Sequence, residues 1–352
     1  MSQHLVIMAG GVGSRFWPMS TPQRPKQFID VMGCGRTLLQ LTFDRFCGIC
    51  QPENIWVVTS AAYADLVREQ LPEVPVSNIL LEPCRRNTAP CIAYVSWRIK
   101  SVDPTANIVV TPSDHIVMNQ AEFQRVVVSA LKFTIETDAI VTLGMKPTRP
   151  ETGYGYIQAD LSAACARNRE IYQVDAFREK PDAATAQRYI AQKNFFWNSG
   201  LFIFRVSTIV NALRIYAPEI SEIFEGMQSV YGTADEQATI NELFPTCPSI
   251  SIDYAVMEKA DEIYVFPADF GWSDLGTWGS LREQTTRDVQ GNAVIGQNVR
   301  LYDSSNCIVH TMDERRVVVQ GLDGYIVAEK DDTLLICRLS DEQLIRQFAE
   351  EQ

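Results

Sequence analysis

Near its start the chain reads Leu5-Val6-Ile7-Met8-Ala9-Gly10-Gly11-Val12-Gly13-Ser14-Arg15-Phe16, an apolar run that breaks abruptly into glycines. A buried strand ends in this way where its carboxyl end opens into a binding crevice. Glycines allow backbone N–H groups to approach an anion that side chains would keep away. This stretch therefore predicts a strand of a parallel sheet followed by an anion-binding loop.

Positive charge gathers just after the loop, at Arg15, Arg24 and Lys26, and no acidic residue occurs before Asp30. The whole chain carries a formal net charge of −12, so most of its surface repels a polyanion. The loop is the exception, and we expect it to hold a nucleoside triphosphate. Because no acidic residue lies nearby in the sequence, the expected partner of Arg15 and Lys26 is phosphate rather than a protein carboxylate.

Two other glycine motifs do not fit this stretch. A dinucleotide-binding fingerprint needs a small residue where Phe16 stands, and a P-loop needs a closing Gly-Lys-Ser/Thr that is absent. A glycine-rich turn between a strand and a helix, without any ligand, is the alternative interpretation.

Composition narrows the class of protein. With 352 residues, 46% of them hydrophobic, the chain can bury a large core and form one large and one small domain. No stretch approaches the ~20 apolar residues of a membrane span, and the first residues do not resemble a signal peptide. Nine irregularly spaced cysteines favour reduced thiols, including Cys47 and Cys50, and the acidic charge disfavours nucleic-acid binding. We expect a cytoplasmic protein without membrane or nucleic-acid partners.

Strand-like and helix-like segments alternate from residue 4 to 143, which is typical of a mainly parallel sheet covered by helices. Ligands of such sheets bind at the carboxyl ends of the strands. The expected strands are Leu5–Met8, Ile55–Thr59, Ile79–Glu82, Ile108–Thr111 and Ile140–Leu143.

Acidic residues follow two apolar segments. Asp114 comes just after the fourth expected strand, where a carboxylate can hold Mg²⁺ beside a triphosphate, although it could instead cap a helix near Glu122–Thr134. His115 is interpreted as structural or merely adjacent. Asp274 lies among tryptophans and glycines, which is an unusual setting for a solvated residue. It is therefore the second candidate metal ligand. Alternatively, Asp274 only stabilises a turn.

The third expected strand runs into Glu82-Pro83, and a helix is expected to begin at Asn87 or Thr88. A role as helix cap would account for Asn87 at this position, but it would not account for Glu82.

Further along, the glycines and tyrosines of residues 153–156 suit a backbone amide that closes on a sugar hydroxyl beside an aromatic wall. A tight bend in an edge strand is the alternative there.

These ordered blocks resemble the sugar-1-phosphate nucleotidylyltransferases, and among them the bacterial guanylyltransferases that act on mannose 1-phosphate. The similarity extends over nearly 280 residues. Its blocks, besides the first loop, are Glu82–Pro90, Pro112–His115, Gly153–Ile157, Glu179–Pro181, Trp197–Gly200 and Gly271–Trp278.

The resemblance implies a reaction of GTP with α-D-mannose 1-phosphate that gives GDP-mannose and pyrophosphate, with Mg²⁺ as cofactor. The implied catalytic residues are Arg15, Lys26, Asp114 and Asp274, of which Asp114 and Asp274 hold the metal. The implied nucleotide-binding residues are Gly10, Gly11, Gly13, Ser14, Arg15, Glu82, Asn87, Thr88 and Asp114. The implied sugar-phosphate-binding residues are Tyr154, Gly155, Glu179, Lys180, Asn198 and Asp274.

Two rivals to this interpretation stay open. One is the same reaction with another sugar or base, such as UTP with glucose 1-phosphate. The other is a catalytically silent relative that binds a nucleotide sugar for regulation, against which the complete set of charged residues counts.

The C-terminal part differs from the rest. From about Gly291, short strand-like segments recur every eight to ten residues, which fits stacked β coils. The resemblance implies a Rossmann-like α/β nucleotidyltransferase domain with a mixed, mainly parallel sheet over residues 1–285. A small left-handed β-helix with a terminal helix is then implied over residues 286–352. That helix, near Asp341–Ala349, could cap the coil or form a homodimer contact.

Overall fold

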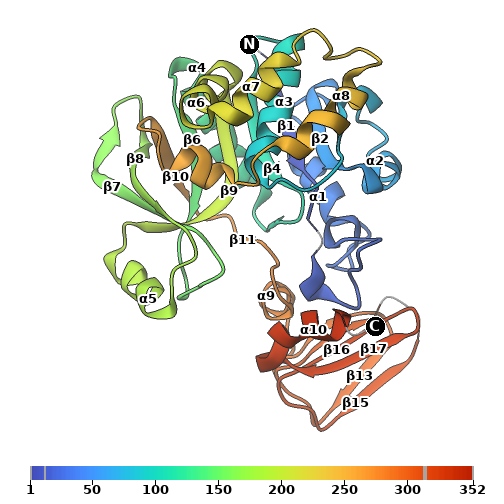
Figure 1. Ribbon diagram of the computed structural model, residues 1–352. Helices are drawn as coiled ribbons and strands as arrows, with labels where there is room; N and C mark the ends of the chain where they lie inside the picture. The colour runs from blue at the N-terminus through green and yellow to red at the C-terminus, as the bar shows by residue number, and fades with distance from the viewer. Residues whose placement is uncertain (1, 12, 312–314, 351–352) are drawn as a thin grey trace. The chain divides into compact units, whose positions relative to one another are not determined.

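The computed structural model of the protein describes residues 2–11, 13–311 and 315–350 (Figure 1). Contacts within the chain divide it into two compact units. The sheet unit comprises residues 1–10, 45–112 and 117–272, and the coil unit comprises residues 11–44, 113–116 and 273–352. The coil unit thus includes the glycine loop from Gly11 onward, and a domain boundary near residue 285 stays a prediction.

A nine-stranded mixed sheet forms the centre of the sheet unit, in the order β3-β2-β1-β4-β9-β6-β10-β8-β7. Strands β1 to β4 are mutually parallel, and β6 is parallel to β10. The five predicted strands are all confirmed. The bounds are β1 Gln3–Met8, β2 Ile55–Ser60, β3 Ile79–Glu82, β4 Asn107–Pro112, β6 Ile140–Met145, β7 Tyr156–Cys165, β8 Asn168–Arg178, β9 Phe195–Arg205 and β10 Ile263–Ala268.

Strand β9 lies between β4 and β6 and is antiparallel to both. Its first residues also pair with β7. The segments after residue 150 therefore extend the same sheet. Short strands β5 Ile116–Val117 and β11 Trp272–Ser273 occur where the chain passes from one unit to the other.

Helix α3 lies deep in the sheet unit, since every residue from Ala89 to Ile99 is buried. It packs against α6 and α7, and Tyr94 stacks on Phe224 with ring centroids 5.9 Å apart (Figure 1). No helix in the described part of the chain is long and apolar enough to cross a membrane. The α-helices of the sheet unit are α2 Ala64–Gln70, α3 Thr88–Val102, α4 Gln120–Glu136, α5 Ala183–Gln192, α6 Val206–Tyr216, α7 Pro218–Gly226 and α8 Glu236–Leu243.

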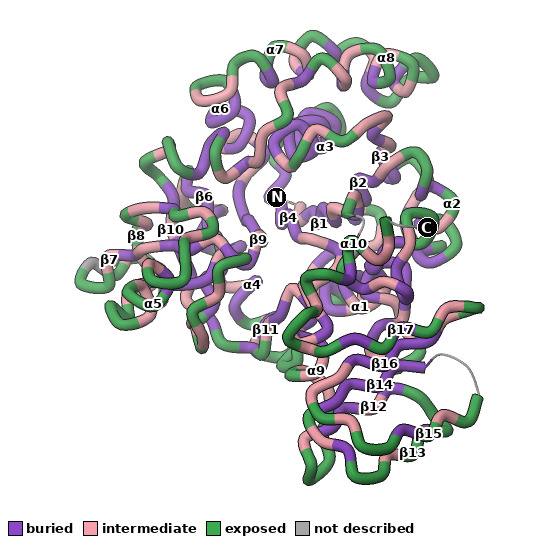
Figure 2. The backbone as a smooth tube through the Cα atoms, turned by 60° about the horizontal axis from the view of Figure 1, so that its bottom comes forward, coloured by how far each residue is buried: buried purple, intermediate pink, exposed green. Residues whose placement is uncertain are grey.

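The coil unit contains two parallel strand ladders, β12-β14-β16 and β13-β15, and β17 adds antiparallel to β16 (Figure 2). The strand-like segments expected from about Gly291 are confirmed as strands. They are β12 Ala293–Ile295, β13 Val299–Tyr302, β14 Ile308–Thr311, β15 Val317–Gln320, β16 Tyr325–Lys330 and β17 Thr333–Arg338.

The same unit has a core shared by its N-terminal and C-terminal segments. Phe16, Trp278 and Ile345 are all buried in it, and the rings of Phe16 and Trp278 lie 5.2 Å apart. The predicted terminal helix is a 3₁₀ segment followed by one α-helix. The helical elements are η1 Ser14–Phe16, η2 Lys26–Phe28, α1 Leu38–Arg45, α9 Trp278–Gln284, η8 Leu339–Leu344 and α10 Ile345–Glu350.

Candidate functional site

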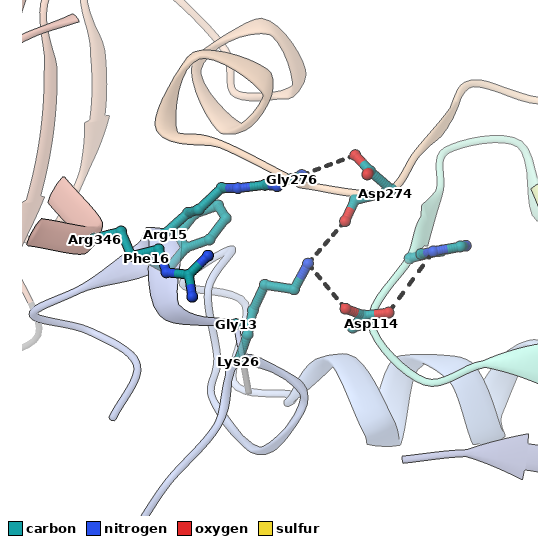
Figure 3. Close-up of a pocket in the computed structure, with 9 residues that line it drawn as sticks. Gly13, Arg15, Phe16, Lys26, Asp114, Asp274, Gly276 and Arg346 are labelled. Carbon is teal, nitrogen blue, oxygen red and sulfur yellow. Dashed lines mark hydrogen bonds and ion pairs between the residues drawn. The ribbon is translucent and has the colours of Figure 1, made fainter. Parts of the chain in front are cut away.

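The coil unit holds a cavity of about 290 Å³ that brings together all four predicted catalytic residues (Figure 3). They reach it from three separate stretches of the chain: Arg15 and Lys26 from the first, Asp114 from the second, Asp274 from the third. Its other lining residues are Gly13, Phe16, His115, Gly276 and Arg346. Two basic side chains and two carboxylates that are far apart in the sequence thus line a single cavity.

Lys26 lies at the centre of this arrangement and is only 4% exposed. Its Nζ is 3.0 Å from Asp114 Oδ2 and donates hydrogen bonds to the backbone oxygens of Asp274, at 2.8 Å, and Leu275, at 3.0 Å. The expectation that Lys26 lacks a protein carboxylate was therefore wrong. The local sequence is free of acids, but the fold brings one from residue 114.

The Asp114 carboxylate is partly buried and faces two basic side chains. Its Oδ1 is 3.7 Å from His115 Nε2, and its Oδ2 is paired with Lys26. Burial alone would raise the pKa of Asp114, but the charges of Lys26 and His115 outweigh it and hold the pKa below its usual value. Asp114 is therefore ionised at neutral pH.

Asp114 does not cap the next helix, which excludes the alternative role considered for it. Helix α4 begins after Asn119, whose side chain accepts a hydrogen bond from the Glu122 backbone N–H at 3.1 Å. Asp274 does take part in a turn, because its Oδ1 accepts from the Gly276 N–H at 2.8 Å. Asp274 nevertheless lines the cavity, so the turn and a ligand-binding role are compatible.

The glycine loop is shaped in part by Lys26. Gly13 has a φ of +63°, and a Cβ placed there would lie 2.5 Å from the Lys26 Cβ. A side chain at this position would therefore push Lys26 out of the cavity. At Gly11 an added Cβ would meet no described atom within 4 Å, so nothing in the fold itself demands a glycine there. Val12 and the Ser14 side chain lie outside the described part of the chain.

In the sheet unit, Glu82 ends β3 and is 8% exposed. Its Oε2 would lie 3.8 Å from a Cβ added to Gly10, the last glycine-loop residue of this unit. Within the described chain its Oε1 is buried without a hydrogen-bond partner. Burial raises the pKa of Glu82 to about 7, against a smaller lowering by a hydrogen bond with the Cys91 thiol. A buried acceptor without a partner, next to the glycine loop, could accept a hydrogen bond from a ligand.

Asn87 and Thr88 have structural roles at the start of α3. The Asn87 side chain accepts a hydrogen bond from the Thr88 N–H at 2.9 Å, which confirms the predicted N-cap. Thr88 Oγ1 accepts from the Ile252 N–H, also at 2.9 Å. Contact of either residue with a nucleotide stays a prediction.

Apart from Asp274, which lines the cavity of the coil unit, the predicted sugar-phosphate-binding residues gather in the sheet unit. A Cβ added to Gly155 would lie 2.7 Å from Glu179 Oε2, so a side chain at this position would displace the carboxylate. The Asn198 N–H donates to the Gly155 oxygen at 2.8 Å, and Lys180 Nζ is 2.9 Å from Glu179 Oε1. Three blocks that are far apart in sequence thus form one polar cluster.

An aromatic wall also forms in this unit. The Tyr154 ring meets Trp197 and Trp272 edge-on, with centroids 5.2 and 5.3 Å apart. Tyr154 is only 9% exposed. Its geometry agrees with an aromatic wall beside a sugar, which binds through apolar faces as well as hydroxyls.

Asp253 belongs to the same cluster but was missed by the sequence reasoning. Its Oδ1 accepts a hydrogen bond from Asn198 Nδ2 at 2.8 Å. Burial, and then the nearby charge of Glu179, raise its pKa. Asp253 opens a π-helical turn, Asp253–Met257, a rare form that is frequent at functional sites. No local signal in the sequence marked Asp253.

Residues 4–291 match the family described as nucleotidyl transferase. The chain belongs to this family. The nucleotidyl transferase is 38% identical to the xanthan biosynthesis protein XanB of Xanthomonas campestris over 334 residues, 94% of this chain and 69% of that protein. It is 36% identical to a mannose-1-phosphate guanylyltransferase of Escherichia coli K12 over 338 residues, 93% of this chain and 70% of that protein.

The nucleotidyl transferase also resembles a solved structure along its entire length. A structure from Thermus thermophilus, described as a mannose-1-phosphate geranyltransferase, has a TM-score of 0.89 and 30% sequence identity. The match covers 100% of this chain and 99% of that chain.

A divalent metal ion is generally used by enzymes of this family. Among the described residues, no group of three or more His, Cys, Asp or Glu side chains could hold one. Mg²⁺, however, commonly takes only one or two protein carboxylates and completes its shell with water and phosphate oxygens. Asp114 and Asp274, lining one cavity, therefore fit an ion that arrives with a phosphate ligand.

Proposed function

We propose that this nucleotidyl transferase transfers GMP from GTP to α-D-mannose 1-phosphate, releasing GDP-mannose and pyrophosphate. The observation that carries the proposal is the cavity that combines Arg15 and Lys26 with Asp114 and Asp274. Two related proteins from Escherichia coli are named as mannose-1-phosphate guanylyltransferases. Each is 36% identical to this chain, over 98% and 93% of its length.

Phosphate and metal binding follow from the charges in the cavity. Arg15 binds the β- and γ-phosphates together with the loop amides, and Lys26 binds the α-phosphate. Asp114 and Asp274 would hold Mg²⁺, which supplies neutralising charge to the phosphates when it is bound. Lys26 already pairs with Asp114, so the incoming phosphate takes over part of that ammonium's hydrogen bonding.

The reaction needs no nucleophilic side chain. An oxygen of the sugar phosphate forms a bond to the α-phosphorus, and the bond from that phosphorus to the bridging oxygen breaks, with pyrophosphate taking the electron pair. The residues of the chain align the two anions and neutralise their charge, which is where enzymes of phosphoryl transfer gain their rate.

Glu82 reads the base in this proposal. Guanine carries N–H donors on its Watson–Crick edge, and an ionised carboxylate accepts two of them. The neutral acid lacks that capacity, since one of its oxygens carries a proton.

Because the pKa of free Glu82 is about 7, we expect GTP affinity to fall about tenfold per pH unit below pH 7 in the wild type. The side chain in Glu82→Gln cannot titrate. Its GTP affinity should therefore change with pH only as far as the GTP phosphates themselves titrate. The check is GTP binding by calorimetry from pH 5.5 to 8.5 for both proteins. Equal slopes would contradict the role of Glu82.

The same pKa affects stability. The folded protein binds the Glu82 proton more tightly than the unfolded chain does, since the pKa is raised from 4.5 to about 7. The contribution of Glu82 to stability is therefore fully present below pH 4.5 and is lost as the pH rises through 7.

Sugar recognition is assigned to the polar cluster of the sheet unit. Glu179, Asn198 and Asp253 accept or donate hydrogen bonds to mannose hydroxyls, and Lys180 lies near the sugar phosphate. The Gly155 amide and the Tyr154 ring complete the sugar site.

Asp253→Asn should raise the KM for mannose 1-phosphate about tenfold and leave the KM for GTP unchanged, because a charged hydrogen-bond acceptor is lost. Glu258→Gln, at an exposed position of the following turn, is the matched control. Steady-state kinetics with mannose 1-phosphate and its deoxy analogues measure both constants. A variant whose KM values for the two substrates rise together would assign Asp253 a structural role.

Three further features complete the proposal. The parallel ladders of the coil unit support a left-handed β-helix over residues 286–352, following the nucleotidyltransferase domain of residues 1–285. The irregular spacing of the nine cysteines supports a cytoplasmic enzyme with reduced thiols. Third, the C-terminal part is proposed to form the contact of a homodimer.

One assay tests the function: pyrophosphate release with each of four nucleoside triphosphates and several sugar 1-phosphates. We expect GTP with mannose 1-phosphate to give the highest kcat/KM. Equal rates with UTP would contradict the guanine assignment. Tight binding of GDP-mannose without turnover of any pair would instead establish a regulatory relative.

A further inference from the structure

The helix α10 brings one more cation, Arg346, into the cavity that holds Arg15 and Lys26. Figure 3 shows the Arg15 and Arg346 side chains on one side of Lys26 and Asp114 on the other. The cavity therefore has two chemically different ends. One end has carboxylates that suit a metal ion, and the other has two guanidinium groups.

Two guanidinium groups that line one small cavity repel each other unless an anion joins them. No carboxylate among the described residues pairs with Arg15. Arg346 has an ion pair with Glu350, one turn along α10, in which Nε and Oε1 are 3.2 Å apart. Both side chains of that pair are more than two-thirds exposed, so water screens it and its contribution is small.

The position of Arg346 is nevertheless well determined by its neighbour Ile345. Ile345 is fully buried in the coil-unit core together with Phe16, the residue next to Arg15. Helix α10 also packs directly against η1, which contains Arg15. One patch of core thus anchors both arginines, and this holds the pair in place before a ligand arrives.

We propose that Arg346 is a phosphate-binding residue, which together with Arg15 binds the pyrophosphate portion of the nucleotide and the pyrophosphate product. The proposal rests on the function proposed above and adds a direction to it: the α-phosphate lies toward Asp114 and the γ-phosphate toward the arginines. Guanidinium groups suit this task, because their fork of N–H donors matches the oxygens of phosphate. The C-terminal helix is then part of the phosphate site.

Direct binding of inorganic pyrophosphate without metal tests the inference apart from turnover. Arg346→Gln should weaken binding about tenfold by calorimetry, whereas Glu350→Gln should tighten it about twofold, because a competing carboxylate is removed. Arg338→Gln is the control, since this exposed arginine lies at the end of β17, donates to the Tyr325 hydroxyl and does not line the cavity. Thermal melting establishes that all three variants are folded.

The reverse reaction supplies the second measurement. With GDP-mannose and pyrophosphate as substrates, Arg346→Gln should raise the KM for pyrophosphate about tenfold and leave the KM for GDP-mannose unchanged, and Arg346→Lys should recover part of the loss. The assignment would be overturned if Arg346→Gln bound pyrophosphate as tightly as Arg338→Gln does. An equal rise in the KM values for pyrophosphate and GDP-mannose would also overturn it. If the wild type does not act on GDP-mannose, the proposed function fails and the calorimetry still decides the role of Arg346.

Discussion

Asp114→Asn and Asp274→Asn should each lower kcat about 10³-fold at ordinary Mg²⁺ concentrations. Both carboxylates line one cavity that also holds Arg15 and Lys26, the cations to which we assign phosphate binding. A shared metal ion contributes several kcal/mol to charge stabilisation, which corresponds to a loss of this size when a ligand is removed. In Asp274→Asn the new side-chain amide keeps an oxygen that can accept the Gly276 N–H, so the turn should survive.

The double variant distinguishes one shared ion from two independent roles. If both residues act through one ion, the double variant should be hardly worse than either single variant. Asp269→Asn, at an exposed position in the neighbouring segment, is the control for a lost charge. Steady-state kinetics over a range of Mg²⁺ concentrations, with melting curves for each protein, measure the effect. Losses that multiply would refute a shared ion.

Lys26→Met should abolish most of the turnover and also destabilise the protein by about 3 kcal/mol, the usual cost of removing one partner from a buried ion pair. The substitution leaves the Asp114 carboxylate and two backbone oxygens without their donor. Arg15→Gln is the contrasting variant, because Arg15 is exposed. It should lower activity and change stability by less than about 0.5 kcal/mol.

The pH dependence of stability gives an independent check on the pair. The lowered pKa of Asp114 adds stability that is present above its unfolded value of 3.8 and is lost as the pH falls through the folded value. In Lys26→Met only His115 and the backbone still lower this pKa against burial, so the contribution should shrink and the urea-unfolding free energy should depend less on pH in the acid range. Lys26→Met combined with Asp114→Asn should regain stability but no activity; stability that stays low would place the cost elsewhere.

Local patterns in the sequence determined much of the sheet and the position of the glycine loop. The strand before Gly10, four further strands and the N-cap at Asn87 were all predictable, because each depends on a short apolar run or on one side chain beside its own backbone. The recurring C-terminal strands were predictable for the same reason. Arg15 and Lys26 were found because their charge stands out in an acidic chain.

The tertiary structure alone decided which of these parts meet. Strand β9 could have paired with any open edge, since an apolar strand carries no local mark of its partner, and only the fold inserts it between β4 and β6. The pair of Lys26 with Asp114 and the bond of Asn198 to Asp253 likewise join residues at least 55 positions apart. Arg346 reaches the cavity only because Ile345 is buried beside Phe16, a contact between the two ends of the chain that no local pattern could indicate.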